Sequence, residues 1–310
     1  MVSSSEIDNI PHIPVLLEET LSLYDGMQNG VFVDCTLGYG GHSEAILERY
    51  PNISLIGIDR DLEAIDFASK RLAKFGDRVR FRHGSYATVF PALDPEVIVG
   101  VLADIGVSSL QLDKRERGFS FLSESLDMRM DQTNPFSAKD VINEYSQADL
   151  ADIIYKYGED RAGRKLADII VQNRPFETAK ELAELIAKHH HVPKIHAATR
   201  LFQAVRIEVN NELGELEALL EATKKLSDDA MVGIITFHSL EDRIVKQTFK
   251  AWTIKCIFPH DAMRCTCGNK HDIGKLINRK PLTASKEELK INKRSRSAKL
   301  RGFTFKKHSS

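Results

Sequence analysis

The sequence predicts an α/β protein whose parallel sheet is interrupted by an all-helical segment. Two observations support this fold class. Short apolar runs rich in β-branched residues alternate with helix-like segments over residues 30–104 and return at residue 230, an order that is typical of parallel sheets. Between residues 114 and 211, by contrast, apolar residues recur only at helical spacing.

Four of the predicted strands lie in the first third of the chain. A cluster of glycines and then a helix over residues 42–50 follow the first strand, and Asp61 is expected to cap the amphipathic helix after the second. The fourth strand is dense in β-branched residues, as expected of a strand that is covered on both faces. The four predicted strands cover residues 30–36, 54–58, 79–84 and 97–104.

The middle of the chain consists of polar loops and amphipathic helices. Strand character returns at residues 230–237, and a helix over 240–251 follows. We therefore assign residues 1–113 and 212–310 to one discontinuous sheet domain, and residues 114–211 to a helical insertion. The helices predicted in the insertion cover residues 138–144, 147–157, 161–173, 179–189 and 197–212.

Charge is balanced over the whole chain but not along it. The 310 residues include 43 Lys and Arg against 44 Asp and Glu, so the net charge gives no indication of nucleic-acid binding. Residues 286–307, however, contain nine Lys or Arg and only two acidic residues. The sequence therefore predicts a basic C-terminal tail on the sheet domain.

The start of the chain lacks the pattern of a signal peptide, and no later stretch reaches the ~20 apolar residues of a membrane span. We therefore expect a cytoplasmic protein with reduced thiols. Zinc has to be considered because Cys256, Cys265, Cys267 and His271 lie close together. Their Cys-x-Cys spacing is not the usual one for zinc, and we expect no bound metal.

A candidate nucleotide site lies where the predicted strands end. The glycine loop from Gly38 to His42, which includes Gly40 and Gly41, follows the first strand, and Asp59 ends the second. Such a loop alone equally fits a tight turn in any α/β protein, but Asp34, Asp59 and Asp104 all end predicted parallel strands. The loop lacks the G-x-G-x-x-G spacing of dinucleotide enzymes. Asp34 suits S-adenosylmethionine, whose amino group it could bind.

Several motifs of the chain resemble one family. The run from Asp104 to Asp113, followed by residues 117–121 and 126–131, is similar to the ribosomal RNA small-subunit methyltransferase H family, also called MraW. The likeness covers nearly the whole chain. Its other motifs are residues 12–17, 36–43, 198–207 with 209–213, 237–243 and 296–301.

The resemblance implies a Rossmann-like class I methyltransferase domain with an inserted all-helical domain. It implies an enzyme that uses S-adenosylmethionine to methylate N4 of a cytidine, C1402 in the usual RNA numbering, in the decoding region of 16S ribosomal RNA. The partner is then the small ribosomal subunit, and a homodimer is compatible with the sequence. The cofactor contacts of the family carry over to Gly40, Gly41, His42, Asp59, Tyr86, Asp104 and Gln111.

The exocyclic amine of cytosine is a weak nucleophile, so the reaction needs alignment and a proton acceptor. Asp104 is our first candidate for the acceptor, and the segment that begins at His238 is the second. Glu241 and Asp242 in that segment equally fit first-turn carboxylates that stabilise a helix. The aromatic residues Phe119 and Phe121 could stack on the base, although such pairs more often serve packing.

Basic residues in two segments are candidates for phosphate contacts. A charge run is more often a solvated face, but these coincide with the motifs that carry the resemblance. The helical insertion could close over a base extruded from the RNA. The candidate RNA-binding residues are Arg200, Arg206, Arg294, Arg296, Lys299 and Arg301.

Three other functions remain open at this point. A nicotinamide-dependent oxidoreductase would share the architecture, but the glycine spacing disfavours it. The second is a ribosome-assembly factor that binds RNA without catalysis, and the acidic residues at three strand ends argue against it because such a factor would not need them. The third is methylation of a protein or a small molecule, and the basic segment argues against it because such a substrate would not need one.

Overall fold

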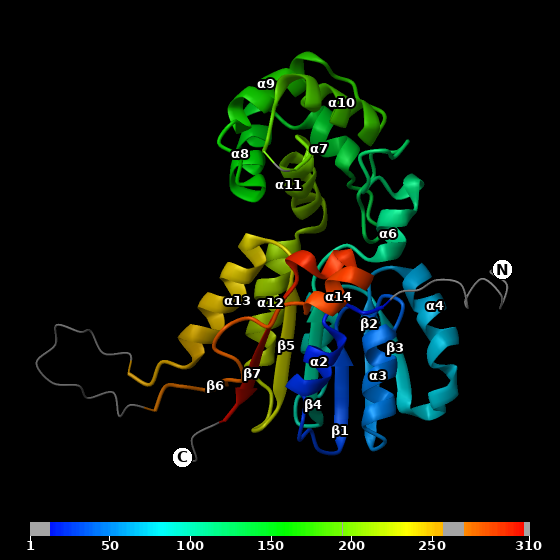
Figure 1. Cartoon of the computed structure of the whole chain (residues 1–310), viewed down its shortest axis with the longest axis vertical. Coiled ribbons are helices and arrows are strands. Elements are labelled where there is room, and N and C mark those ends of the chain that lie inside the picture. The colour runs from blue at the N-terminus through cyan, green and yellow to red at the C-terminus, as the bar shows by residue number, and fades with distance from the viewer. Residues whose placement is uncertain (1–12, 194, 257–269, 307–310) are drawn as a thin grey trace, which may run out of the picture. The chain divides into compact units, whose positions relative to one another are not determined.

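The structure is a computed structural model that describes residues 13–193, 195–256 and 270–306. It divides into two compact units (Figure 1). The sheet unit comprises the described residues up to Gly106 and from Glu215 onward, and the helical unit comprises Val107–Gly214. In the described part of the chain, no helix is long and apolar enough to cross a membrane.

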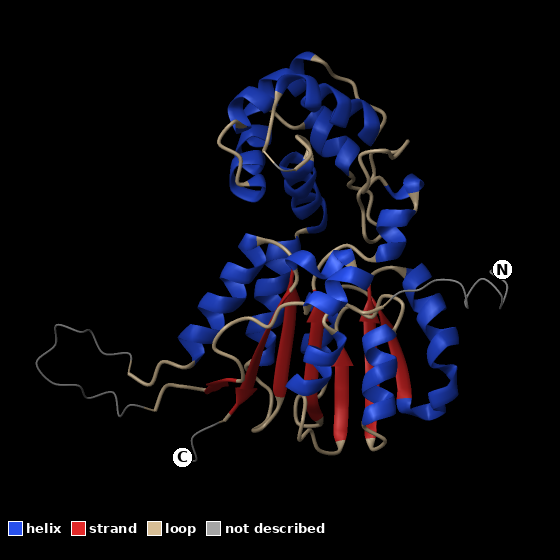
Figure 2. Ribbon diagram, in the orientation of Figure 1, coloured by secondary structure: helices blue, strands red, loops and turns tan. Residues whose placement is uncertain are grey.

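The sheet unit contains seven strands in the order β3-β2-β1-β4-β5-β7-β6, which Figure 2 shows in red. Strands β1 to β5 are parallel, whereas β7 runs antiparallel to both β5 and β6. The α/β fold and the five predicted strands are thus confirmed. The strands are β1 (Gly30–Asp34), β2 (Ile53–Asp59), β3 (Val79–His83), β4 (Ile98–Asp104), β5 (Met231–Thr236), β6 (Gly274–Leu276) and β7 (Lys299–Phe305).

Both faces of the sheet are buried. Side chains alternate along a strand, so Phe32 belongs to the core on one face and Val33 to the core on the other. The first core includes residues of α2, α3 and α4, and the second includes residues of α5, α12 and α13. The helices are α2 (Leu17–Leu23), α3 (Gly41–Arg49), α4 (Leu62–Leu72), α5 (Tyr86–Val89), α12 (Glu212–Thr223), α13 (Ser239–Trp252) and α14 (Lys286–Ile291).

The helical unit has its own hydrophobic core, to which Leu150, Leu166 and Leu182 contribute. Capping boxes at Ser137 and Thr178 fix the starts of two of its helices. The helices are α6 (Ser109–Asp113), α7 (Ala138–Glu144), α8 (Gln147–Gly158), α9 (Gly163–Gln172), α10 (Ala179–His189) and α11 (Thr199–Asn210).

The helix predicted over residues 197–212 is wrong in its extent. Helix α11 ends at Asn210, because Asn211 adopts a left-handed conformation with φ 48°, and α12 begins at Glu212. Asparagine is one of the few residues that tolerate this conformation. The predicted insertion, 114–211, also differs from the helical unit, which begins at Val107 and ends at Gly214.

The basic C-terminal segment is not a tail where the structure describes it. Residues 286–297 form α14 and a 3₁₀ helix, and residues 299–305 form β7. Leu300, Phe303 and Phe305 of β7 are buried in the two cores of the sheet unit. Lys299 and Arg301 on either side of Leu300, and Gly302 before Phe303, conceal the strand pattern in the sequence.

Candidate functional site

The three aspartates that end β1, β2 and β4 lie at one edge of the sheet. Since these strands are parallel, their carboxyl ends meet there. The strand order also reverses at β1, whose two neighbours, β2 and β4, lead away in opposite directions. Open α/β sheets bind ligands in the crevice at such a switch point. The sheet therefore places Asp34, Asp59 and Asp104 where a cofactor is expected.

The glycine loop connects β1 to α3 at this edge. Gly38 and Gly40 adopt positive φ angles of 50° and 74°, which glycine reaches without strain. A Cβ atom at Gly40 would lie 3.3 Å from Leu72 and 3.4 Å from Ala68 of α4, so the backbone packs closely there. Helix α3 has no capping side chain. Its N-terminus therefore suits the carboxylate of a ligand.

Asp59 braces this loop. Its Oδ2 accepts a hydrogen bond of 2.8 Å from the Gly38 amide, and its Oδ1 accepts one of 2.9 Å from the Asp61 amide. Burial raises the pKa of the carboxyl group. Each carboxylate oxygen has two lone pairs, so Asp59 can also accept hydrogen bonds from ribose hydroxyls.

Asp34 is satisfied from within the protein. Its Oδ2 accepts from the Ser43 hydroxyl at 2.7 Å and its Oδ1 from the Thr36 amide at 3.1 Å, and only 2 % of the residue is exposed. Burial raises its pKa to about 6. These bonds tie β1 to the first turn of α3, so Asp34 shapes the glycine loop.

Asp104 differs from the other two aspartates. Its amide donates to the Thr36 hydroxyl at 2.7 Å, but among the described residues its shielded Oδ1 atom has no hydrogen-bond partner. Burial, and then the charges of Asp34 and Glu241, raise its pKa to about 8. The side chain as a whole keeps 23 % of its surface exposed. An unpaired carboxyl oxygen destabilises the protein unless a ligand pairs with it.

His42, in the first turn of α3, is 8 % exposed. Its Nε2 lies 2.9 Å from the Val15 carbonyl, to which it donates a hydrogen bond. Burial lowers its pKa to about 4, so the imidazole is neutral. The Nδ1 atom is then an acceptor, and it lies 4.0 Å from Asp104 Oδ2.

Tyr86, a cofactor contact that the resemblance implies, lies beside a network of three residues that the sequence motifs did not indicate. Ser85 donates a hydrogen bond to Glu215, and Arg60 makes an ion pair of 3.0 Å with the same carboxylate. The Arg60 guanidinium carbon lies 5.9 Å from the centroid of the Tyr86 ring. Gln111 belongs to the helical unit, where its Oε1 accepts a 3.1 Å hydrogen bond from the Ser108 amide.

His238 and Glu241 form the start of α13. Glu241 is completely buried, and its Oε2 accepts from the amides of Phe237 and His238 at 2.8 and 3.2 Å. The capping role considered for Glu241 is therefore present. His238 Nε2 and Glu241 Oε1 lie 2.9 Å apart but are not aligned for a hydrogen bond, and neither atom has another partner in the described chain. Asp104 pairs with Ile235 in the β4–β5 register, so His238 follows the neighbouring strand end.

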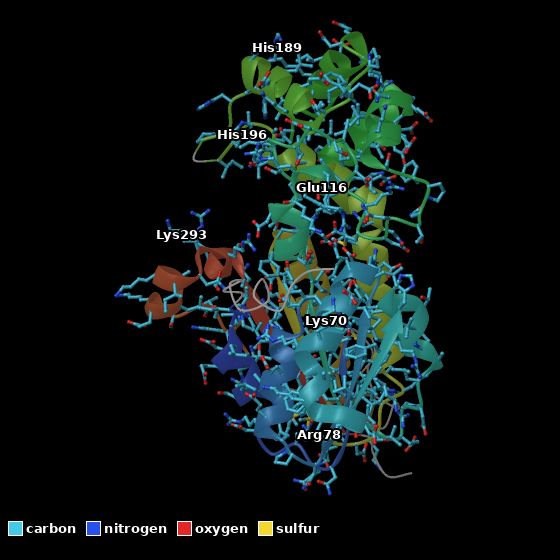
Figure 3. The ribbon with its side chains drawn as sticks, turned by 90° about the vertical axis from the view of Figure 1, so that its right-hand side faces the viewer. Lys70, Arg78, Glu116, His189, His196 and Lys293 are labelled. Atoms are coloured by element: carbon cyan, nitrogen blue, oxygen red, sulfur yellow. The ribbon has the colours of Figure 1, made fainter. Side chains whose placement is uncertain are left out.

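The candidate RNA-binding residues differ in their surroundings. Arg301 is 9 % exposed and binds Asp242 at 2.7 Å, and Lys299 lies 3.3 Å from the same carboxylate. Arg206 makes two hydrogen bonds with Glu212. Arg200 and Lys299 keep 42 % and 40 % of their side chains exposed, although Arg200 lies 3.7 Å from the buried Asp160 carboxylate. Arg294 and Arg296 are exposed. Figure 3 shows Lys293, the neighbour of Arg294, on the outside of the sheet unit.

Phe119 and Phe121 pack within the helical unit. Phe119 belongs to its core, and the Phe121 ring stacks on His196 with 4.4 Å between the centroids. The zinc set named above cannot be assembled from the described residues, because Cys265 and Cys267 lie outside them. His12 of the first motif lies outside them as well.

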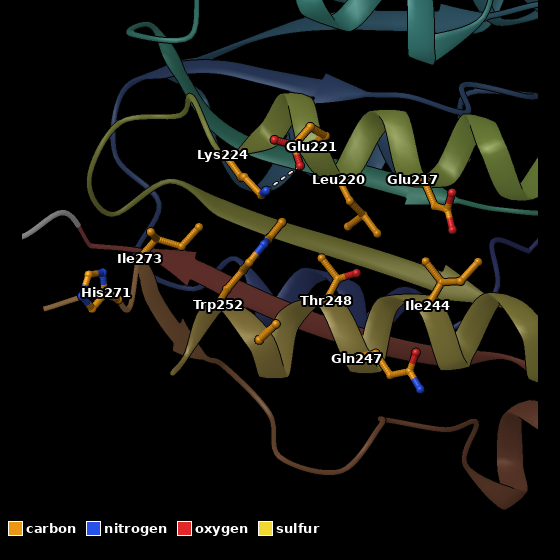
Figure 4. A pocket seen from close by; sticks show the side chains of 11 residues that line it. Glu217, Leu220, Glu221, Lys224, Ile244, Gln247, Thr248, Trp252, His271 and Ile273 are labelled. Carbon is orange, nitrogen blue, oxygen red and sulfur yellow. Dashed lines mark hydrogen bonds and ion pairs between the residues drawn. The ribbon is translucent and has the colours of Figure 1, made fainter. Parts of the chain in front are cut away.

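A separate cavity of about 610 Å³ lies along α12 and α13 (Figure 4). None of the predicted catalytic, cofactor-binding or RNA-binding residues lines it, although His271 of the zinc set does. Its walls combine apolar side chains such as Trp252 and Ile273 with the ion pair between Glu221 and Lys224. The candidate site is therefore the edge of the sheet at Asp34, Asp59 and Asp104.

Comparisons with known proteins identify the family of the chain. Residues 9–306 match the model of the MraW methylase family. The chain is 58 % identical over 302 residues to the ribosomal RNA small subunit methyltransferase H of Nautilia profundicola, covering 96 % of this chain and 98 % of that one. It is 53 % identical over 309 residues to the protein of the same name from Sulfurimonas denitrificans, covering 97 % and 100 %.

Among solved structures, an rRNA methylase from Streptococcus thermophilus aligns with 95 % of this chain and 98 % of its own, with a TM-score of 0.41 and 7 % identity. That likeness is too weak to support an argument. The match to the family model and the two close relatives confirm the resemblance that the motifs indicated. By these two findings, the chain belongs to the MraW methylase family.

Proposed function

We propose that the chain methylates N4 of cytidine C1402 in the 16S RNA of the small ribosomal subunit, in the cytoplasm. S-adenosylmethionine is the methyl donor of this methylase family. The relatives' name, ribosomal RNA small subunit methyltransferase H, supports the choice of RNA. The base and the nitrogen follow from the motif resemblance. The observation that carries the proposal is the unpaired Asp104 carboxyl beside the glycine loop at the switch point of the sheet.

The described residues fit the donor. Gly38, Gly40 and Gly41 bring the backbone close to a ligand, and Asp59 offers acceptors for ribose hydroxyls. Asp104 Oδ2 and His42 Nδ1, which lie 4.0 Å apart, are acceptors for the amino group of the methionine end. Tyr86 and Gln111 complete the set of cofactor contacts that the motif resemblance implies. When bound, S-adenosylmethionine supplies an electrophilic methyl group on a positively charged sulfur.

The protein must compensate for a weak nucleophile. The lone pair of the cytosine amine is delocalised into the ring, so the site has to align the nitrogen and exclude water. It must also accept the proton that the nitrogen loses once the new N–C bond has formed. We assign this role to Asp104, whose Oδ1 is unpaired.

His238 is the second candidate for the proton acceptor. It follows the end of β5, the neighbour of β4, and its Nε2 lies 2.9 Å from Glu241 Oε1 without the alignment of a hydrogen bond. Its Nδ1 lies 3.5 Å from the Glu241 amide, in the geometry of a helix cap. In this arrangement the proton of a neutral ring is on Nε2, which faces Glu241 Oε1 at 2.9 Å, so neither ring nitrogen is free to accept a proton. We therefore place the acceptor role on Asp104.

The test is methyl transfer from labelled S-adenosylmethionine to assembled small subunits and to naked 16S RNA, followed by nucleoside analysis. We expect N4-methylcytidine with the wild type and a loss of at least about 100-fold with Asp104→Asn. His238→Gln separates the two acceptor candidates, because it should retain more activity than Asp104→Asn. Methylation of protein or of a small molecule, without labelled RNA, would refute the proposal.

A further inference from the structure

A short segment near the N-terminus, residues 13–16, packs against the start of α3, and we call it the strap. The Val15 carbonyl accepts the 2.9 Å hydrogen bond from His42 Nε2. A Cβ atom at Gly41 would lie only 2.5 Å from the ring of Pro14. The strap therefore rests directly on the glycine loop, and glycine is needed at residue 41 for this close approach.

The strap is also held by residues 288–295, which precede the C-terminal motif at residues 296–301. The Leu16 amide donates to Glu288 Oε1 at 2.8 Å, and the Asn292 side-chain amide donates to the Ile13 carbonyl at 3.0 Å. Ser295 also donates to Glu288 Oε1 and so fixes that carboxylate. Two residues that are 272 positions apart in the sequence are thus joined by a hydrogen bond.

The strap needs this support because its backbone is strained. Leu16 has φ 54° and ψ 42°, a left-handed conformation that is unfavourable for leucine. Its side chain is fully buried, and its backbone amide donates the hydrogen bond that Glu288 accepts. Without Glu288, Leu16 would lose the bond that offsets this strain.

The consequence reaches the cofactor site through His42. As long as the Val15 carbonyl accepts from Nε2, the neutral ring keeps its proton there and presents Nδ1 as an acceptor, 4.0 Å from Asp104 Oδ2. If the strap moved away, Nδ1 could take the proton instead. An Nδ1–H group would repel the ammonium group of an amino-acid ligand.

We propose that Glu288 and Asn292 are positioning residues for the cofactor, which hold the strap so that His42 Nδ1 stays an acceptor for the ligand's ammonium group. The inference rests on the proposed cofactor site at the glycine loop. It gives residues 288–292 of the basic C-terminal segment a function that does not involve RNA.

The first measurement is titration calorimetry of the full chain with S-adenosylhomocysteine, which has the same amino-acid end. Glu288→Ala should weaken binding by about tenfold, and Glu288→Gln, which keeps the acceptor oxygen, should stay within about threefold of wild type. Asn292→Asp keeps the side-chain oxygen that accepts from the Arg294 amide but loses the donor to Ile13, so it should also bind more weakly. Glu287→Ala, on the exposed neighbour, is the matched control.

The second measurement distinguishes positioning from general destabilisation. Imidazole ¹⁵N shifts of the ligand-free protein, assigned with His42→Gln, report which nitrogen carries the proton. We expect the Nε2–H form of His42 in the wild type and in Glu288→Gln, and a shift toward Nδ1–H in Glu288→Ala. Binding within twofold of wild type in Glu288→Ala would overturn the inference, as would weaker binding with unchanged His42 shifts.

The same pair of measurements separates this inference from the function on which it rests. If the wild type itself bound no S-adenosylhomocysteine, the proposed cofactor site would be refuted. The ¹⁵N shifts of the ligand-free variants would still decide whether Glu288 controls the His42 tautomer.

Discussion

At the scale of single residues, the three aspartates at the sheet edge have similar places but different environments. The carboxylate oxygens of Asp34 and Asp59 accept hydrogen bonds from amides and a hydroxyl of the protein. Asp104, by contrast, has an oxygen without a partner among the described residues. All three carboxyl pKa values are raised by burial, that of Asp104 the most, to about 8. Local sequence does not distinguish them, since each simply ends a strand.

The pH dependence of methyl transfer should report the ionisation of Asp104. A proton acceptor must be ionised, and burial raises its pKa to about 8. We expect kcat/KM to rise about tenfold per pH unit below that value and to level off above it. Stopped assays on small subunits across this range measure the profile, with Asp104→Asn as the reference without the group. A wild-type profile that stays flat between about pH 6 and pH 9 would contradict the assignment.

Asp104 should also affect stability in the absence of ligand. Its pKa in the folded protein, about 8, is above the ordinary value of 3.8, so folding favours the protonated carboxyl group. Its contribution to the free energy of unfolding is therefore complete below about pH 4 and is lost as the pH rises toward 8. Asp104→Asn cannot ionise and avoids this loss. Thermal unfolding should show a Tm a few degrees higher than wild type at pH 8, with the difference narrowing toward pH 4. A difference that does not change with pH would show that ionisation is not its cause.

At the scale of elements, the helices that local signals define were the most predictable. The predicted limits of α7 and α10 agree with the structure, because Ser137 and Thr178 start them with capping boxes that can be read from four consecutive residues. The break at Asn211 depends instead on a single left-handed residue. Apolar residues on both sides of it continue the helical spacing, so the periodicity did not reveal the break.

The cap of α10 offers a test of the helical unit. The Thr178 hydroxyl accepts a 3.1 Å hydrogen bond from the Glu181 amide. Thr178→Ala should therefore lower the free energy of unfolding by about 1 kcal/mol, whereas Thr178→Ser should lose little. Urea unfolding followed by circular dichroism measures both. Equal losses in the two variants would indicate that the methyl group, and not the hydroxyl, stabilises the helix start.

At the scale of the whole molecule, the residues of the basic segment fall into two groups with different surroundings. Arg301 and Lys299 are engaged with Asp242 within the sheet unit, while Arg294 and Arg296 are exposed. A net charge of −1 conceals this division, because acidic residues elsewhere cancel the local charge. Phosphate contacts depend on the local field and not on the total charge.

The two groups of basic residues should respond differently to mutation. If Arg294 and Arg296 bind phosphate, their double replacement by alanine should weaken RNA binding and reduce the slope of log K against log salt by about two, one for each lost contact. Arg301→Ala should instead destabilise the fold, since it leaves the Asp242 carboxylate without its 2.7 Å partner. Filter binding over a salt series and thermal unfolding measure the two effects. An unchanged slope in the double variant would remove these arginines from the interface.

The amino-acid sequence by itself determined the parallel sheet, the acidic strand ends, the glycine loop and the family. Each of these features can be recognised in a short segment of the sequence, because strand runs, tight turns and motifs depend on residues that are neighbours in the chain. Only the tertiary structure decided that residues 299–305 pair with β5, that Asp34 is satisfied by Ser43, and that Glu288 reaches Leu16. Strand pairing and side-chain hydrogen bonds across long separations depend on which surfaces pack together, and no local pattern encodes that.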